Sequence, residues 1–150
     1  MLRGLARDRV VAEAGCLLGY STIVMAQVAR HVTAIDPHDG YPVYAPRPTL
    51  QLFCENVRRA GVEDRITEVV GFGQDHIPAA EVVFLDLTGE RHVTEACMRR
   101  AQLAGAGAIA VHDYARGGCE GATEAVDSFV RQNGWDVTRT DTLVVLTKTH

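Results

Sequence analysis

Short apolar runs alternate with stretches of helical periodicity along this 150-residue chain. The apolar runs predict five strands, over Val10–Ala14, Val32–Asp36, Ile66–Val70, Val82–Asp86 and Ala108–His112. The fourth run reads VVFL before its acid and shows no polar alternation, as expected for a strand covered on both faces. This pattern is typical of a parallel sheet with helices packed on both sides.

Between these runs, apolar residues recur at the spacing of an amphipathic helix. The spacing predicts four helices, over Ser21–Arg30, Thr49–Ala60, Val93–Leu103 and Ala122–Asn133. Gly61 and Gly134 directly follow two of them, and glycine often follows a helix because it readily adopts left-handed backbone angles. The last apolar stretches, Trp135–Thr140 and Leu143–Thr147, predict a closing hairpin. Together these elements predict an α/β fold in a single domain, residues 1–150.

Composition narrows the class of protein. The net charge is −4, and the longest basic clusters are the pairs Arg58-Arg59 and Arg99-Arg100, which argues against a nucleic-acid partner. No apolar run reaches membrane-spanning length, and the start MLRGLARDR lacks the apolar core of a signal peptide. We therefore expect no membrane contact and a cytoplasmic protein. The four cysteines form no C-x-x-C pair, which argues against a disulfide framework or a zinc site.

The beginning of the chain carries the pattern of a nucleoside-type ligand site. The first apolar run ends in Glu13, a turn with glycines at Gly15 and Gly19 follows, and the second run ends in Asp36. A dinucleotide site requires G-x-G-x-x-G, because the middle glycine lets the backbone approach a pyrophosphate. The G-x-x-x-G spacing here lacks that glycine, and a G-x-x-x-x-G-K-S/T phosphate loop is absent as well. We expect a ligand with a zwitterionic tail and no phosphate, which disfavours an NAD-dependent oxidoreductase.

These residues have suitable chemistry for such a ligand. The carboxylate of Asp36 can accept two hydroxyl hydrogen bonds at once. The free amides at the helix start near Ser21 and Thr22 can receive a ligand carboxylate. The alternative is that Glu13 and Asp36 only cap strands and that the glycines only turn the chain.

Candidate catalytic groups end the fourth and fifth apolar runs. The motif FLDLTGE places Asp86 there, and AVHDY places His112 and Asp113 there. The carboxyl ends of parallel strands meet at one edge of a sheet, so these groups are expected near Asp36. His112 is the natural general base, because imidazole has an unperturbed pKa of about 6.5. The alternatives are that His112 only bonds backbone and that Asp86 only caps the next helix.

The order and spacing of these motifs resemble the class I S-adenosylmethionine-dependent methyltransferases. The endings FLD and HDY, followed by GGCEGATEAVDSFV-x-x-x-GW, are similar to a bacterial small-molecule O-methyltransferase branch related to catechol-type enzymes. The resemblance covers Val10–His150. It implies a Rossmann-like, doubly wound, mostly parallel seven-stranded sheet with an antiparallel last strand. It also implies methylation of a small hydroxylated molecule, such as a sugar, a polyketide or an aromatic natural product.

The resemblance assigns roles to individual residues. The glycine turn would hold the methionine moiety of S-adenosylmethionine, Asp36 would bond the ribose hydroxyls, and the segment after the third strand would form the adenine rim, including His76. The implied cofactor-binding residues are Glu13, Gly15, Gly19, Ser21, Thr22, Asp36, Pro37, Gly73, Gln74, Asp75 and Asp86. The implied catalytic residues are His112, Asp113 and Asp86.

A divalent metal is a further implication, and here the chain departs from its relatives. Acids at the ends of strands four and five bind the metal in catechol-type enzymes, and Asp86 and Asp113 match them in a way that suits Mg²⁺. However, LTGERH follows Asp86 where relatives carry G-D-H, and Tyr114 replaces the catechol-type asparagine. These departures leave two alternatives to methylation: a non-methylating reaction such as cyclisation or elimination, or a role as a binding partner subunit.

Two features concern the substrate side of the site. The segment Pro37–Pro48 holds four of the five prolines and two tyrosines, and it leaves the second strand at the ligand edge. It is expected to be a lid or substrate wall, with a stiff surface connection as the alternative. Only nine residues precede Val10, where relatives carry helices that close over the substrate. Either the start is truncated, or the proline segment or a second subunit covers the site. We therefore expect a homodimer in which the Pro37–Pro48 segment or the amino terminus caps the partner's pocket.

Overall fold

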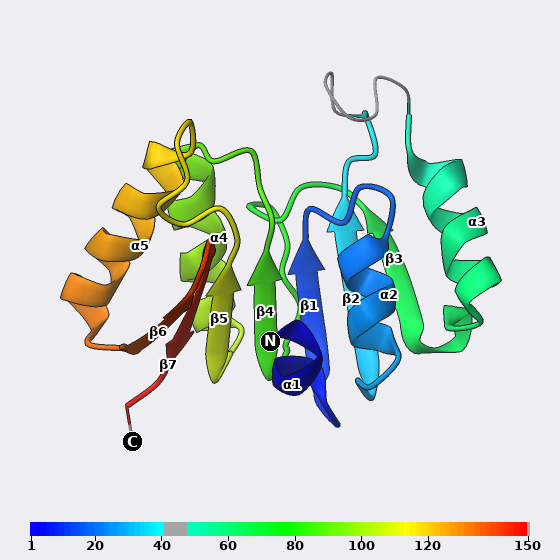
Figure 1. The fold of residues 1–150 in the computed structure, drawn as a ribbon, viewed down its shortest axis with the longest axis horizontal. Coiled ribbons are helices and arrows are strands. Elements are labelled where there is room, and N and C mark those ends of the chain that lie inside the picture. Colours follow the sequence, from blue (N-terminus) through cyan, green and yellow to red (C-terminus); the bar gives the residue numbers. More distant parts are fainter. Residues whose placement is uncertain (41–47, 150) are drawn as a thin grey trace.

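A single mixed sheet forms the centre of the computed structural model, which describes residues 1–40 and 48–149 (Figure 1). Most of the predicted lid, Pro37–Pro48, lies outside the described residues. The strand order is β3-β2-β1-β4-β5-β7-β6. The strands are β1 Val10–Ala14, β2 His31–Asp36, β3 Ile66–Val70, β4 Val82–Leu85, β5 Ala108–Val111, β6 Asp136–Thr140 and β7 Leu143–Thr147.

The pairing confirms the predicted sheet type. Strands β1 to β5 pair in parallel, whereas β7 pairs antiparallel with both β5 and β6. The chain moves outward from β1 to β2 and β3, then crosses back to place β4 on the other side of β1. Ligands of open α/β sheets bind at the carboxyl edge beside such a reversal of strand order. The carboxyl ends of β1, β2, β4 and β5 meet at the upper edge in Figure 1.

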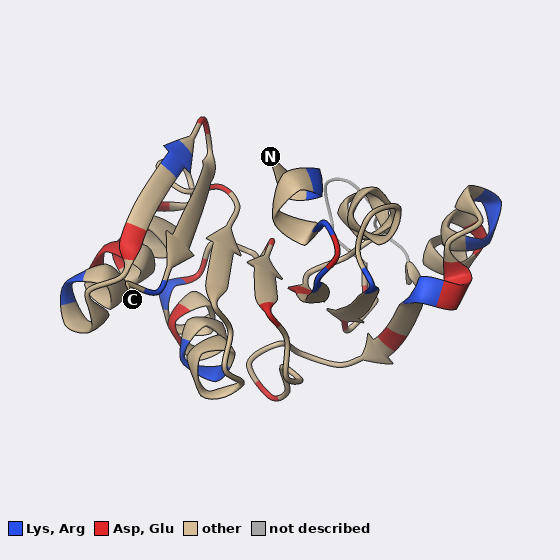
Figure 2. Ribbon diagram, turned by 90° about the horizontal axis from the view of Figure 1, so that it is seen from below, with Lys and Arg blue, Asp and Glu red and all other residues tan. Residues whose placement is uncertain are grey.

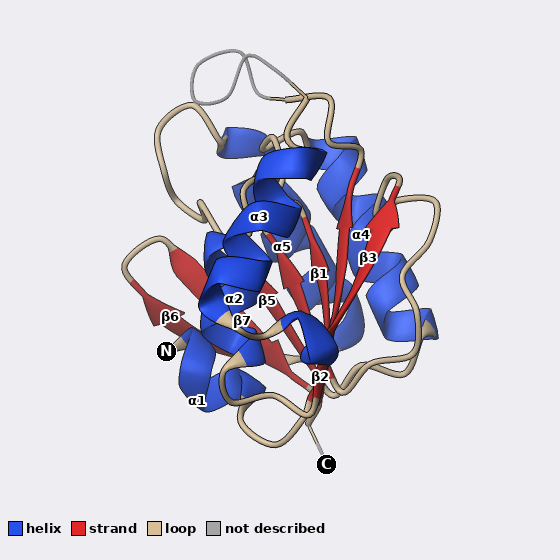
Figure 3. Ribbon diagram, turned by 90° about the vertical axis from the view of Figure 1, so that its right-hand side faces the viewer, coloured by secondary structure: helices blue, strands red, loops and turns tan. Residues whose placement is uncertain are grey.

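Helices cover both faces of the sheet, as Figure 3 shows from the side. The helices are α1 Leu2–Ala6, α2 Tyr20–Ala26, α3 Leu50–Ala60, the 3₁₀ turn η1 Glu63–Arg65, α4 Arg91–Leu103 and α5 Glu120–Asn133. Met25 of α2 and Phe53 of α3 are buried in one core, while Met98 of α4 and Phe129 of α5 are buried in the other. Successive strand residues point to opposite faces, so each apolar strand contributes to both cores.

Several predicted boundaries are wrong, and hydrogen bonds between distant segments explain one of them. Helix α2 ends at Ala26, not Arg30, and the amide of Arg30 donates to the carbonyl of Arg9 at 2.9 Å. That bond ties the end of this connection to the start of β1. Helices α4 and α5 begin two residues earlier than predicted, while α1 has no counterpart in the prediction. The described residues 71–81, between β3 and β4, form no helix.

Charged residues of both signs are distributed over the ribbon, as the view from below shows (Figure 2). Among the residues that the structure describes, no helix combines the length and apolar character needed to cross a membrane.

Candidate cofactor and catalytic site

The candidate site lies where four neighbouring strands end. Glu13, Asp36, Asp86 and His112 lie at the carboxyl ends of β1, β2, β4 and β5, respectively, and these four strands are adjacent in the sheet. The fold therefore brings together residues that are up to a hundred positions apart in the chain. This edge lies beside the reversal of strand order, where ligand sites of such sheets form.

Close packing explains both glycines of the turn after β1. Gly15 has φ +90°, and a β-carbon there would lie 1.9 Å from the carbonyl oxygen of Asp86. Gly19 has φ +85° and is the N-cap of α2, and its β-carbon would lie 2.9 Å from Cδ2 of Phe53. The G-x-x-x-G spacing thus lets the turn fit against the end of β4 on one side and α3 on the other.

The side chain of Glu13 is directed into the protein. It is fully buried, and its two carboxylate oxygens accept hydrogen bonds from the hydroxyls of Ser21 and Thr22. Burial raises the pKa of Glu13 to about 7, although the two hydroxyls act in the opposite direction. Glu13 therefore fixes the start of α2 against β1, and the hydroxyls of Ser21 and Thr22 face this carboxyl group.

Glu13→Gln is expected to remove a pH-dependent loss of stability. The carboxyl pKa is higher in the folded protein (about 7) than its ordinary value of 4.5, so its stabilising contribution is complete below pH 4.5 and is lost as pH rises through about 7. The free energy of unfolding of the unsubstituted protein should fall by up to about 3 kcal/mol more than that of the variant between about pH 5 and about pH 8. Urea titrations at both pH values measure this difference. Exposed Glu63→Gln should behave like the unsubstituted protein, and equal pH dependence in Glu13→Gln would contradict the assignment.

Asp36 is held firmly but keeps capacity for a ligand. One carboxylate oxygen accepts the amide of Leu17 at 2.9 Å, and the other accepts the amide of His38 at 2.7 Å. A carboxylate has about four lone-pair positions, so two protein donors leave room for two ligand hydroxyls. Asp36 is 8% exposed, and Pro37 follows it in a partly buried position.

The segment predicted to form the adenine rim crosses the end of β1. A β-carbon on Gly73 would lie 2.6 Å from Cβ of Ala14, and the guanidinium of Arg100 on α4 donates to the carbonyl of Gln74. Asp75 and its neighbour His76 are exposed. Sequence reasoning missed Phe72, which is 49% exposed directly before Gly73. The signal was an aromatic residue between two glycines in the motif GFG.

His112 and two carboxylates form a compact cluster on the other half of the edge. Its Nδ1 lies 3.2 Å from Oδ1 of Asp86 and 3.3 Å from Oδ1 of Asp113. The hydrogen bond to Asp86 is the main cause of a raised pKa of His112, and the charge of Asp113 adds to it. Because both acids face Nδ1, neutral imidazole carries its proton there, and Nε2 remains an acceptor. The side chain is 37% exposed, so a substrate can reach it.

Side-chain contacts of Asp113 and Tyr114 hold the loop after β5 in place. Asp113 has a left-handed φ of 59°, and its Oδ1 accepts a hydrogen bond from the guanidinium of Arg116 at 2.8 Å. Tyr114 is buried, and its hydroxyl donates to Oδ1 of Asp127 at 2.9 Å. The guanidinium of Arg139 lies over its ring, 4.5 Å from the centroid. Tyr114 thus points away from the cluster, toward α5.

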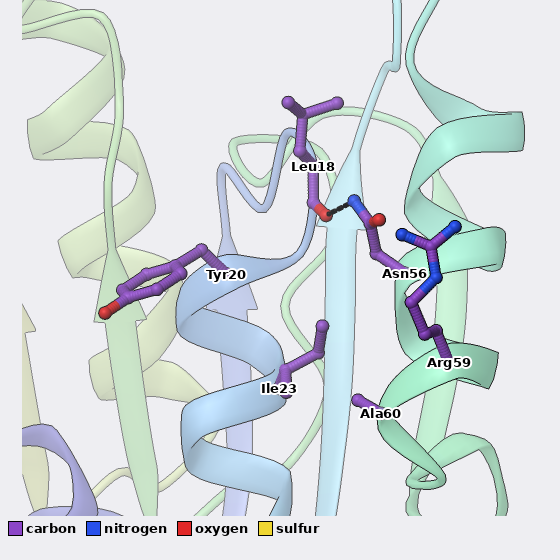
Figure 4. Close-up of a pocket in the computed structure, with 6 residues that line it drawn as sticks. All are labelled: Leu18, Tyr20, Ile23, Asn56, Arg59 and Ala60. Carbon is purple, nitrogen blue, oxygen red and sulfur yellow. Dashed lines mark hydrogen bonds between the residues drawn. The ribbon is translucent and has the colours of Figure 1, made fainter.

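A separate surface groove of about 440 Å³ lies between α2 and α3 (Figure 4). It is lined by Leu18, Tyr20, Ile23, Asn56, Arg59 and Ala60. The amide of Asn56 donates to the carbonyl of Leu18 at 3.0 Å, which joins the glycine turn to α3. None of the site residues predicted from sequence lines this groove.

Solved structures of methyltransferases have the same fold as this chain. The O-methyltransferase NovP superposes with a TM-score of 0.79 at 17% identity, over 99% of this chain and 75% of that one. The O-methyltransferase from Bacillus cereus, solved with SAH (S-adenosylhomocysteine), superposes with a TM-score of 0.74 at 16% identity, over 98% of this chain and 77% of that one. The chain therefore has the same fold as these methyltransferases, a seven-stranded sheet with an antiparallel strand β7.

A curated relative by sequence is a methyltransferase as well. The chain is 34% identical over 124 residues to the catechol O-methyltransferase of Mycobacterium tuberculosis. The match covers 79% of this chain and 54% of that protein, so the chain spans about half the length of this relative. No family model matches the chain.

Proposed function

We propose that this protein transfers the methyl group of S-adenosylmethionine to a hydroxyl oxygen of a small molecule. The observation that carries the proposal is the His112 imidazole, on the same sheet edge as Asp36. Its Nδ1 faces Asp86, while its Nε2 has no hydrogen-bond partner among the described residues. An oxygen nucleophile must lose its proton as it attacks, so a base must be held beside it. Similarity to proteins named catechol O-methyltransferase and NovP O-methyltransferase supports oxygen as the acceptor atom.

The residues present fit the cofactor. Asp36 lies on the half of the sheet edge that would bind it, and His112 lies on the half that would bind the acceptor. Asp36, with lone pairs left over from its two backbone donors, accepts the ribose hydroxyls. When bound, S-adenosylmethionine would supply an electrophilic methyl group to the acceptor oxygen and would leave as S-adenosylhomocysteine. His112 Nε2 takes the proton of the acceptor hydroxyl. Asp86 and Asp113 then stabilise the imidazolium through Nδ1.

Cofactor binding gives the first test. We expect calorimetry to detect binding of SAH and no binding of NADH. Asp36→Ala should weaken SAH binding by about 2 kcal/mol, roughly 30-fold, because two hydrogen bonds to a charged acceptor are lost. Asp64→Ala, an exposed acid in η1, is the matched control. Binding of NADH in place of SAH would overturn the proposal, and methyl-labelled cofactor with a panel of sugars, polyketides and phenols then tests transfer itself.

Mg²⁺, which the catechol-type resemblance implies, fits this cluster poorly. Asp86 and Asp113 would hold it, and with His112 they place three donor atoms within 4.8 Å of one another. However, Arg116 already donates to Asp113, and Tyr114, at the position of the third catechol-type ligand, is bonded to Asp127 instead. Imidazole is also a softer ligand than Mg²⁺ prefers.

Methyl transfer is therefore expected to be unchanged by EDTA, because His112 rather than a metal acidifies the acceptor. The measurement is the initial rate of label transfer before and after chelation and dialysis, with Mg²⁺ added back. A loss of rate that Mg²⁺ restores would contradict this expectation and assign Asp86 and Asp113 to the metal.

A further inference from the structure

A buried polar cluster lies behind Asp36, and the proposed mechanism leaves it unused. His38 is 3% exposed, Thr49 is fully buried and Cys16 of the glycine turn is also buried. The cluster joins three elements, because Cys16 follows β1, His38 follows β2 and Thr49 precedes α3. Burial of polar groups is costly unless they bond one another, so the arrangement has a specific geometry.

The hydroxyl of Thr49 has an unusual hydrogen-bond partner for a threonine at a helix N-cap. It occupies the N-cap position of α3, where a threonine hydroxyl commonly bonds a free amide of its own helix, but it makes no such capping bond. Its hydroxyl instead lies 2.9 Å from Nδ1 of His38, and its amide donates to the carbonyl of His38, also at 2.9 Å. Two hydrogen bonds therefore join His38 to the start of α3.

His38 in turn orients Asp36 through its backbone. His38 has a φ of +57°, a left-handed conformation that costs energy in any residue with a β-carbon. In this conformation its amide points at Oδ1 of Asp36, 2.7 Å away. The ring is fixed by Thr49, by Phe53 with ring centroids 5.3 Å apart, and by Cys16 with Sγ 3.9 Å from Nε2. These contacts hold the strained backbone in place.

We propose that Thr49 and His38 are positioning residues for the ribose of the cofactor. Thr49 holds the His38 ring, and the His38 amide holds one oxygen of Asp36 while the Leu17 amide holds the other. With both oxygens held, the carboxylate cannot rotate, and its remaining lone pairs face the ribose hydroxyls. This inference rests on the proposed function, because it takes the ligand of Asp36 to be S-adenosylmethionine.

The chain offers a matched control for a single-hydroxyl deletion. Thr49→Val removes the hydroxyl and keeps the shape of the side chain, whereas Thr49→Ser retains the hydroxyl and should rescue the effect. Thr67 makes the same type of bond at the other end of β2, with Oγ1 3.0 Å from Nε2 of His31 in an exposed position. Thr67→Val therefore removes an equivalent hydrogen bond that is distant from the site.

Binding of two ligands, one with and one without the ribose hydroxyls, separates a positioning role of Thr49 from a general loss of structure. Calorimetry should show that Thr49→Val weakens binding of SAH about two- to tenfold. The same variant should bind 2′,3′-dideoxy-SAH, which lacks the ribose hydroxyls, as tightly as the unsubstituted protein does. In turnover assays the KM for S-adenosylmethionine should rise and kcat should not change. Thr49→Ser and Thr67→Val should match the unsubstituted protein.

Equal weakening of both ligands, or no weakening of either, would overturn the positioning role. If Thr49→Val does not fold, His38→Asn provides the second test, because asparagine tolerates a positive φ but cannot bond Thr49 in the same way. His38→Asn should likewise weaken binding of SAH and leave binding of the dideoxy analogue unchanged. Failure of the unsubstituted protein to bind SAH would instead overturn the proposed function, and this inference with it.

Discussion

His112→Ala is expected to lower kcat for methyl transfer by about 10²- to 10⁴-fold, the usual contribution of a positioned general base. The affinity for SAH should not change, because Asp36 and the glycine turn lie on the other half of the edge. The hydrogen bond from the His112 amide to the carbonyl of Leu85 involves backbone only, so the variant should retain β5 in place. Single-turnover rates with labelled cofactor, together with SAH calorimetry, measure the two quantities separately.

A histidine outside the cluster provides the control for this prediction. His92 lies at the start of α4, has a side chain that is 81% exposed, and contacts Glu90 rather than the cluster, so His92→Ala should retain full activity. Added imidazole should partly restore the rate of His112→Ala by occupying the vacated space. Retention of full kcat by His112→Ala would show that His112 is not the base.

The pH dependence of kcat provides a second test of His112 as the general base. A base must be deprotonated to act, so kcat should fall as pH decreases through the raised pKa of His112. The hydrogen bond to Asp86 is the main cause of that raised pKa, so Asp86→Asn should move this limb of the profile to lower pH. A limb that stays in place in Asp86→Asn would assign the titration to another group.

Gly15→Ala is expected to destabilise the protein by roughly 2 to 6 kcal/mol, through backbone strain and steric overlap together. The φ of +90° is unfavourable for alanine, and the added β-carbon would lie 1.9 Å from the carbonyl oxygen of Asp86. To relieve the overlap, the end of β4 must move away from β1, which also displaces Asp86 from His112. Urea unfolding gives the stability, and the rate of methyl transfer reports the displacement.

Gly61→Ala separates the effect of backbone strain from the effect of steric overlap. Gly61 follows α3 with a φ of +66°, and nothing lies within 4 Å of the position of an added β-carbon. This variant therefore has strain without overlap, and its loss of stability should be roughly 1 to 2 kcal/mol. If Gly15→Ala lost no more stability than Gly61→Ala, close packing against Asp86 would not be the reason for glycine in the turn.

The order of elements could be read from the sequence because each strand and helix has a local signature. The apolar run before Asp86 and the helical spacing before Gly61 arise from burial on both faces and on one face, respectively. Element ends were less predictable. Ala26 ends α2 where the helical pattern would have continued to Arg30, which bonds Arg9 across the fold. Such a bond joins residues far apart in sequence and has no local signal.

The candidate site was also predictable only in part from the sequence. Asp36, Asp86 and His112 could be placed at one edge, because parallel strands bring their carboxyl ends together. The sequence could not show that Nδ1 of His112 faces Asp86, since the two residues follow different strands and meet only when β4 and β5 pair. Nor could it show that Tyr114 points toward Asp127 on α5.

By itself the sequence determined the α/β alternation, the G-x-x-x-G turn and the acids and histidine at strand ends, because periodicity and glycine spacing are local properties. The tertiary structure alone decided what those residues face. It turned Glu13 inward to Ser21 and Thr22, and it placed His38 between Thr49 and Asp36. The physical reason is that a polar group buried by folding must bond whichever partner the packing brings near, and packing depends on the whole chain.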